Sequence, residues 1–347
     1  MASMAHAIAV DYTANLTSSA TNLAVSTVGL ISLMLSVFNF APIDESLPGG
    51  YLTFRLGIAI NQYEDMGAGG DHPDVRLWTE QGDFTGIYTA EGMKPKTGYL
   101  HDGEIGDLII PQNNIYNDMP TYALLSANNN GICIAYVQIA GADGPDLAWV
   151  GNWGRTCQKE WYHSGIVIGG KALECTWIDK NGDHDTTGLQ VHFPDFRYSG
   201  EGYDRDAEYL CTHPPSLSFR TEPDPKTVIF YTPGKRSSPP KRGSTLRARS
   251  EPAPVFTDQR LIKSNLTIHT ASSLCESTTS RGPDFVSLPE GRFCDMETKK
   301  LWPICASPQE GDCFDNEAHD VRLVGSVGKR DGPVALMKNY TRVTHWE

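Results

Sequence analysis

The eight cysteines constrain this chain more than any other feature of its 347 residues. They form two groups of four, separated by a basic stretch rich in proline and serine: Cys133, Cys157, Cys175 and Cys211, then Cys275, Cys294, Cys305 and Cys313. None lies in a C-x-x-C motif or accompanies paired histidines, which disfavours zinc ligation. The even number indicates disulfides, and pairing within each group reduces the possible connectivities more than tenfold. The alternative is buried free thiols in a cytosolic protein.

Short apolar or alternating segments, typical of strands, recur through residues 49–215. Clear examples are residues 51–60, 132–139 and 189–193, and turn-forming residues separate them, as at 128–131. Glycine and proline number 33 and 22, so turns are frequent. Many short strands with such turns predict a mainly β protein, with an antiparallel β-sandwich or jelly-roll-like domain at 49–215.

The other segments differ in composition from this domain. Residues 216–262 are basic and rich in proline and serine, which predicts an exposed linker. Residues 263–347 hold the second cysteine group and predict a small disulfide-rich module, which either folds alone or packs onto the first domain and completes its sheets. Residues 1–48 lack lysine and arginine and contain an apolar run at 24–41. This run is an atypical leader, a signal-anchor or a packed helix, and we expect no membrane contact beyond it.

The charge of the chain bears on its partners and its processing. A net charge of −13 and a pI near 5.2 disfavour nucleic-acid binding. Three dibasic pairs are candidate sites for a secretory-pathway protease, or else solvated basic loops, with cleavage expected after Arg236, Arg242 and Arg330. Three N-x-[ST] sequons are candidate glycosylation sites, namely Asn15, Asn265 and Asn339.

A candidate calcium loop follows the strand-like segment 175–178. Oxygen-bearing side chains occupy alternate positions at Asp179, Asn181, Asp183 and Asp185, and such oxygens can converge on a calcium ion. The pattern is similar to the start of an EF-hand loop but lacks its later glycine and glutamate, so a calcium loop of another kind is one interpretation and not the favoured one. The alternative is a hairpin with an Asn-Gly turn and solvated acids, joining 175–178 to 189–193.

Large aromatic residues are concentrated shortly before this loop, at Trp149, Trp153, Trp161 and Tyr162. Exposed rings of this kind stack on sugars, so the cluster is a candidate glycan-binding surface. The alternative is that the rings fill the core of the sandwich, as large aromatic side chains usually do.

Several segments resemble secreted, cysteine-containing proteins of filamentous fungi. They are residues 127–161 and 175–183, residues 280–295, and the late Lys-Arg-Asp at 329–331. That group has no established activity. The resemblance implies an extracellular fungal protein and contributes no catalytic residues.

The sequence carries no G-x-S-x-G, H-E-x-x-H, Walker A or Rossmann motif. The leading hypothesis is therefore a secreted fungal protein without enzymatic activity, which binds a glycan, a surface or a host component. One alternative is a secreted carbohydrate-active hydrolase that uses carboxylates without a recognisable motif, for which the acidic segment 201–208 is a candidate. A second alternative is a precursor processed at the dibasic sites.

Overall fold

The computed structural model describes residues 50–60, 66–90, 98–113, 119–141, 147–168, 170–196, 207–231, 259–306, 311–323 and 334–347. The predicted N-terminal segment and the central part of the predicted linker lie outside these residues. Strands make up 47% of the structure and helices 10%, which confirms a mainly β fold.

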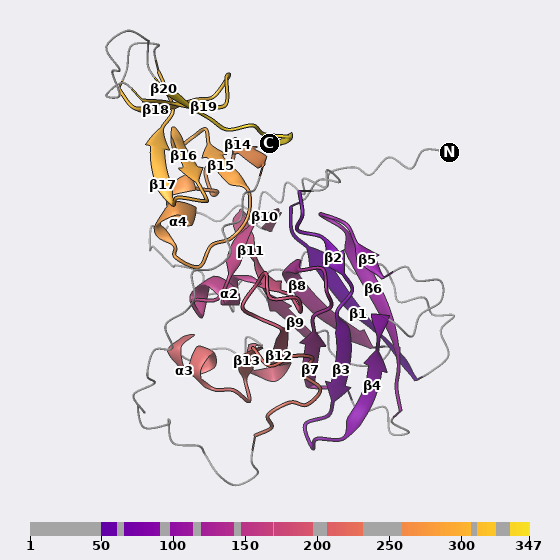
Figure 1. The fold of residues 1–347 in the computed structure, drawn as a ribbon. Coiled ribbons are helices and arrows are strands. Elements are labelled where there is room, and N and C mark those ends of the chain that lie inside the picture. Colours follow the sequence, from indigo (N-terminus) through magenta and orange to yellow (C-terminus); the bar gives the residue numbers. More distant parts are fainter. Residues whose placement is uncertain are drawn as a thin grey trace, which may run out of the picture.

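The first large sheet has six strands in the order β10-β11-β8-β1-β6, with β9 paired to β8, and every pair is antiparallel (Figure 1). The strands are β1 (Tyr51–Ile58), β6 (Ile105–Pro111), β8 (Ile132–Gly141), β9 (Leu147–Val150), β10 (Trp161–Ile168) and β11 (Lys171–Ile178).

The second large sheet has five strands in the order β13-β12-β7-β3-β4, again all antiparallel. The strands are β3 (Asp74–Trp78), β4 (Phe84–Tyr88), β7 (Tyr122–Ser126), β12 (Gly188–His192) and β13 (Leu217–Arg220). A two-stranded ribbon of β2 (Gly70–Asp71) and β5 (Tyr99–Leu100) contacts β8 of the first sheet.

The two large sheets share one hydrophobic core and form the predicted antiparallel sandwich. Phe54 and Leu56 of β1 belong to the same buried cluster as Leu77 of β3, Leu125 of β7 and Val191 of β12. Sheets that each bury one face in this way are held together mainly by apolar surface removed from water.

The segment between β11 and β12 passes from one sheet to the other. β11 pairs with β10 and β8, whereas β12 pairs with β7 and β13. The expected hairpin between 175–178 and 189–193 is therefore wrong. The Asn-Gly signal gives a local turn there, but the apolar strand after it is buried in the second sheet.

Both ends of the predicted linker are folded. At the first end, β13 pairs with β12, and Val228 is buried against Trp78 and Tyr122 on the outer face of the second sheet. At the other end, residue 260 begins β14 (Arg260–Ser264). The average composition of this stretch conceals the short apolar run at 228–231, which packs on the sheet.

The C-terminal module consists of the described residues from 259 onwards. Its larger sheet has the order β17-β16-β15-β14-β21, with β15 (Asp284–Ser287), β16 (Arg292–Asp295), β17 (Lys300–Pro303) and β21 (Arg342–Trp346). β14 runs parallel to both β15 and β21, so this sheet is mixed. A second sheet joins β18 (Cys313–Asp315), β19 (Asp320–Leu323) and β20 (Val334–Met337).

Short helices connect the strands, and disulfides hold several of these connections. The helices are α2 (Asn152–Thr156), η2 (Phe193–Phe196), α3 (Ala207–Thr212) and α4 (Ala271–Glu276). All eight cysteines are paired, as Cys133–Cys175, Cys157–Cys211, Cys275–Cys294 and Cys305–Cys313. Every bond lies within one group of four, as the sequence predicted.

The C-terminal module packs on the edge of the first sheet, at β10 (Figure 1). The backbone of Trp161 accepts a hydrogen bond from Arg281 N (2.9 Å) and pairs with Ser280 as a parallel bridge. Phe285 and Trp346 of the module lie in the same core cluster as the sandwich. The module therefore packs onto the first domain, as one of the two alternatives expects, but its described strands form sheets of their own and do not complete those of the sandwich.

Candidate functional site

The four predicted glycan-binding aromatics are all buried, so this prediction is wrong. Trp149, Trp161 and Tyr162 are fully buried and Trp153 is 2% exposed. Two of them form hydrogen bonds inside the protein: Trp161 Nε1 donates to Ser277 Oγ and the Tyr162 hydroxyl donates to Pro283 O. The rings fill the core and the contact with the C-terminal module, as the alternative interpretation expects.

The side chains of Asp179 and Asn181, two of the predicted calcium residues, form hydrogen bonds within and beside the loop. Asp179 is fully buried, and its carboxylate accepts hydrogen bonds from the backbone of Asn181 (3.4 Å) and Asp183 (3.0 Å). The amide of Asn181 donates to Asn129 O (2.8 Å), and Asp185 is exposed. Within the described ranges, no group of three His, Cys, Asp or Glu side chains could hold a metal ion. These oxygens fold the loop itself, as side chains of Asp and Asn often do in turns.

The modification sites fall partly within the structure. Asn265, directly after β14, and Asn339, shortly before β21, are both exposed. Asn15 and the three dibasic sites at Arg236, Arg242 and Arg330 lie outside the described residues.

A different group of polar residues meets at the outer face of the second sheet. β12 ends at His192, and the following turn of η2 returns Asp195 to the same imidazole. Glu80 comes from the tight turn after β3, in which Thr79 N bonds Asp83 O (2.9 Å). Two separate segments of the chain, the turn after β3 and the continuous stretch of β12 and η2, thus place two carboxylates on one histidine.

The hydrogen bonds of this group run from the interior to the surface. His192 Nδ1 lies 2.9 Å from Asp195 Oδ2, and His192 Nε2 lies 2.8 Å from Glu80 Oε2. Thr121 Oγ1 donates to the same Glu80 oxygen at 2.9 Å, and the Tyr231 hydroxyl donates to Asp195 Oδ2 at 2.7 Å. The side chain of Asp195 is 2% exposed, whereas that of Glu80 is 50% exposed. Glu80 is therefore a fixed carboxylate that faces solvent.

The environment stabilises a charged Asp195 and neutral tyrosines. Burial alone would raise the pKa of Asp195, but hydrogen bonds from His192, Ser216 and Tyr231 outweigh it and lower the pKa. Burial raises the pKa of Tyr122 to about 12 and also raises the pKa of Tyr231. Both hydroxyls therefore remain protonated at neutral pH.

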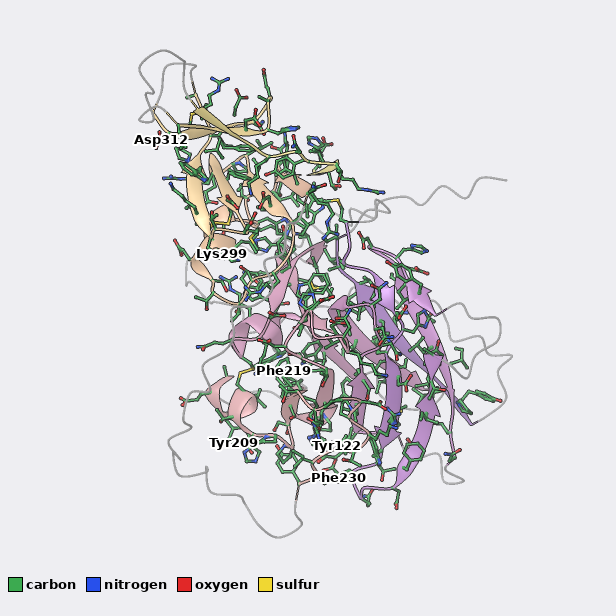
Figure 2. All side chains as sticks on the ribbon, in the orientation of Figure 1. Tyr122, Tyr209, Phe219, Phe230, Lys299 and Asp312 are labelled. Atoms are coloured by element: carbon green, nitrogen blue, oxygen red, sulfur yellow. A yellow bond between two sulfur atoms is a disulfide. The ribbon has the colours of Figure 1, made fainter. Side chains whose placement is uncertain are left out.

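Aromatic rings surround this group. Tyr122 stacks on His192 with ring centroids 4.2 Å apart, and Phe230 meets Tyr122 edge-on at 5.1 Å. Trp78 contacts both Phe230 (6.4 Å) and Phe84 (5.6 Å), and Phe84 is 42% exposed. Figure 2 shows Tyr122 and Phe230 together at the end of the sandwich remote from the C-terminal module. We call Glu80, His192, Trp78, Phe84 and Phe230 the carboxylate–aromatic site.

Buried Gln190 holds one wall of this site in place. Its amide oxygen accepts from Ile229 N and its amide nitrogen donates to Ile229 O, both at 2.8 Å. This pair of bonds fixes the residue next to Phe230 against β12. Sequence reasoning missed the site because its residues are distant in the chain; Glu80 and His192 are 112 residues apart.

The fold and the disulfides define a disulfide-bonded, mainly β protein with a sandwich and an attached C-terminal module. No protein-family model matches the chain, and no curated protein matches it either. In the part of the chain that the structure describes, no helix is both long enough and apolar enough to cross a membrane.

Proposed function

We propose that this chain is a secreted protein that binds a carbohydrate without transforming it, and that the ligand contacts the carboxylate–aromatic site. The single observation that carries the proposal is Glu80, a half-exposed carboxylate held by His192 and Thr121 beside aromatic rings. Sugar hydroxyls donate to carboxylates, and the apolar faces of sugars pack on aromatic side chains. An extracellular setting is supported by the four disulfides and by the resemblance to secreted fungal proteins.

A hydrolase is the second candidate, and the Asp195–His192–Glu80 arrangement is the observation that favours it. A buried carboxylate that orients a histidine is a recurrent feature of acid–base sites. Both carboxylates, however, bond the same imidazole rather than facing each other across an open gap. Residues 201–206 of the acidic segment lie outside the described part, and Glu208 is an exposed residue of α3. Binding is therefore the better-supported function.

The test is a glycan array followed by titration of soluble oligosaccharide hits. We expect Glu80→Gln and Phe84→Ala to weaken binding at least about tenfold, since each removes one ligand contact. Glu317→Gln is the matched control, because Glu317 is an exposed glutamate of the C-terminal module. Equal affinity of Glu80→Gln and the control would refute the site. New reducing ends released from a bound glycan, and lost in Glu80→Gln, would favour the hydrolase.

A further inference from the structure

One lysine of the C-terminal module is enclosed by two carboxylates. Lys338 follows β20, and its Nζ lies 3.0 Å from Asp284 Oδ2 and 2.9 Å from Asp295 Oδ1. Asp284 begins β15 and Asp295 ends the antiparallel partner β16, so both carboxylates lie at the same end of this strand pair. Their side chains are 3% and 10% exposed. The amine is therefore held against two acids that are largely shielded from water.

Asp284 is arranged as an electrophile. Its Oδ1 accepts a hydrogen bond from Met296 N (2.7 Å), and its Oδ2 accepts one from the Tyr340 hydroxyl (2.6 Å). Burial raises the pKa of Asp284 to about 6, so the neutral acid is accessible near neutral pH. The backbone N–H on Oδ1 would also stabilise negative charge developing on that oxygen.

Asp295 is placed to accept a proton from the amine. Burial alone would lower the pKa of Lys338, but the charges and hydrogen bonds of Asp284 and Asp295 outweigh it and raise the pKa. The ammonium must therefore lose a proton before it can react, and Asp295 Oδ1 is in direct contact with it. Proton transfer within such a desolvated pair replaces two buried charges with two neutral groups.

We propose that Lys338 and Asp284 become joined by an isopeptide bond after the chain has folded. The bond Nζ–Cγ forms, the bond Cγ–Oδ2 breaks, and Oδ2 leaves as one water molecule. Asp295 accepts two protons from Nζ, one after the other, and passes both to the departing oxygen, so that the nitrogen keeps one hydrogen as the amide N–H. An ammonium and a carboxylate thus become an amide and water, without an oxidant or a cofactor. Fixed proximity of the reacting groups provides the acceleration that this condensation lacks in water.

A second Lys–Asp pair shows why the surroundings matter. Lys226 and Asp224 also lie 3.0 Å apart, but their side chains are 63% and 36% exposed. Water solvates both ions there and competes for the carboxyl carbon. This exposed pair is an internal control that should remain an ordinary ion pair.

The experiment is tryptic peptide mapping of the reduced, deglycosylated full-length protein. An amide at Lys338 blocks trypsin there and links residues 282–292 to residues 331–342 in one branched peptide, lighter by one water than its parts. We expect this peptide in place of the linear peptide 331–338, together with normal cleavage after Lys226. A complete set of linear peptides would overturn the proposal. A branch to residues 293–299 would also overturn it, because Asp295 would then be the electrophile.

Two variants test the assigned roles. Asp295→Asn keeps the shape of the side chain but cannot accept the proton, so the folded protein should yield linear peptides. Lys338→Arg keeps the positive charge and should also yield only linear peptides. Folding of each variant is checked by its circular dichroism and its melting temperature. Undiminished cross-linking in folded Asp295→Asn would overturn the role of Asp295.

Discussion

His163 of β10 and His269 of the C-terminal module lie with their ring centroids 5.0 Å apart, across the contact between the two parts of the protein. Both residues are buried. His163 Nε2 lies 3.2 Å from Thr270 O, whereas His163 Nδ1 and His269 Nε2 have no hydrogen-bond partner among the described residues. A proton on either ring would be a buried charge beside another basic ring, so the contact requires both histidines to be neutral.

This pair predicts that the folded protein loses stability in mild acid. Burial lowers the pKa of His163 from 6.5 to about 3, with a further contribution from His269, and burial lowers that of His269 to about 4. Below about pH 6.5 the unfolded chain binds protons that the folded chain excludes. Stability is therefore complete above that pH and falls as the pH drops towards 4 and then 3. Urea unfolding should show a loss of roughly 2–4 kcal/mol between about pH 7 and about pH 5.

A substitution by a neutral residue can test whether these histidines cause the loss of stability in acid. His269→Gln should reduce the loss of stability in acid, whereas His101→Gln, which changes an exposed histidine, should leave it unchanged. In protein molecules where Asp284 is still a free carboxyl, its raised pKa contributes the opposite pH dependence, which is the same in all three proteins and cancels in the comparison. An identical slope for His269→Gln and the parent protein would contradict the prediction.

Cleavage between residues 231 and 259 should leave a two-chain complex. No disulfide joins the two cysteine groups, but Trp161 and Tyr162 bond the backbone of residues 279–283, and Glu160 pairs with Arg281 (3.2 Å). A side chain at Gly67 (φ +75°) would collide with the guanidinium of Arg260, so the side chain of this β14 residue reaches the sandwich. A specific protease site introduced in this interval allows the test.

After cleavage, both fragments should elute together in native size-exclusion chromatography and separate in denaturing, non-reducing electrophoresis. Separation under native conditions would show that the shared core does not hold the parts together. The result also bears on the precursor hypothesis, because processing after Arg236 or Arg242 would not by itself release the C-terminal module.

Local patterns in the sequence predict the sandwich strands and the disulfide partition, but not the arrangements that depend on distant residues. The alternation in β12 identifies a strand, yet nothing near His192 indicates that Glu80 will reach it. The apolar run that includes Phe230 is short and lies within a basic, proline-rich stretch, so average composition conceals it. The burial of Trp149 depends on β9 lying in the core, which composition cannot distinguish from an exposed position.

The disulfides should differ in their contribution to stability. Cys157–Cys211 spans 54 residues, whereas Cys305–Cys313 spans 8. A cross-link restricts the unfolded chain more when it closes a longer loop, so replacing the first pair by serine should cost about 4 kcal/mol and the second about 2–3 kcal/mol. Guanidinium unfolding of the two double variants measures the difference. Equal losses would show that strain or packing, rather than loop length, dominates.

Aromatic substitutions should distinguish rings that stabilise the core from rings of the carboxylate–aromatic site that contact the ligand. Trp149→Ala removes a fully buried ring and should lower the free energy of unfolding by about 3–5 kcal/mol. The milder Trp149→Phe should keep the fold and bind glycans as the parent protein does, because Trp149 lies inside the core. Phe84→Ala, at a ring that is 42% exposed, should cost about 1 kcal/mol or less in stability but weaken binding. A binding defect in folded Trp149→Phe without one in Phe84→Ala would contradict this prediction. It would indicate that the ligand binds near Trp149 and not at the carboxylate–aromatic site.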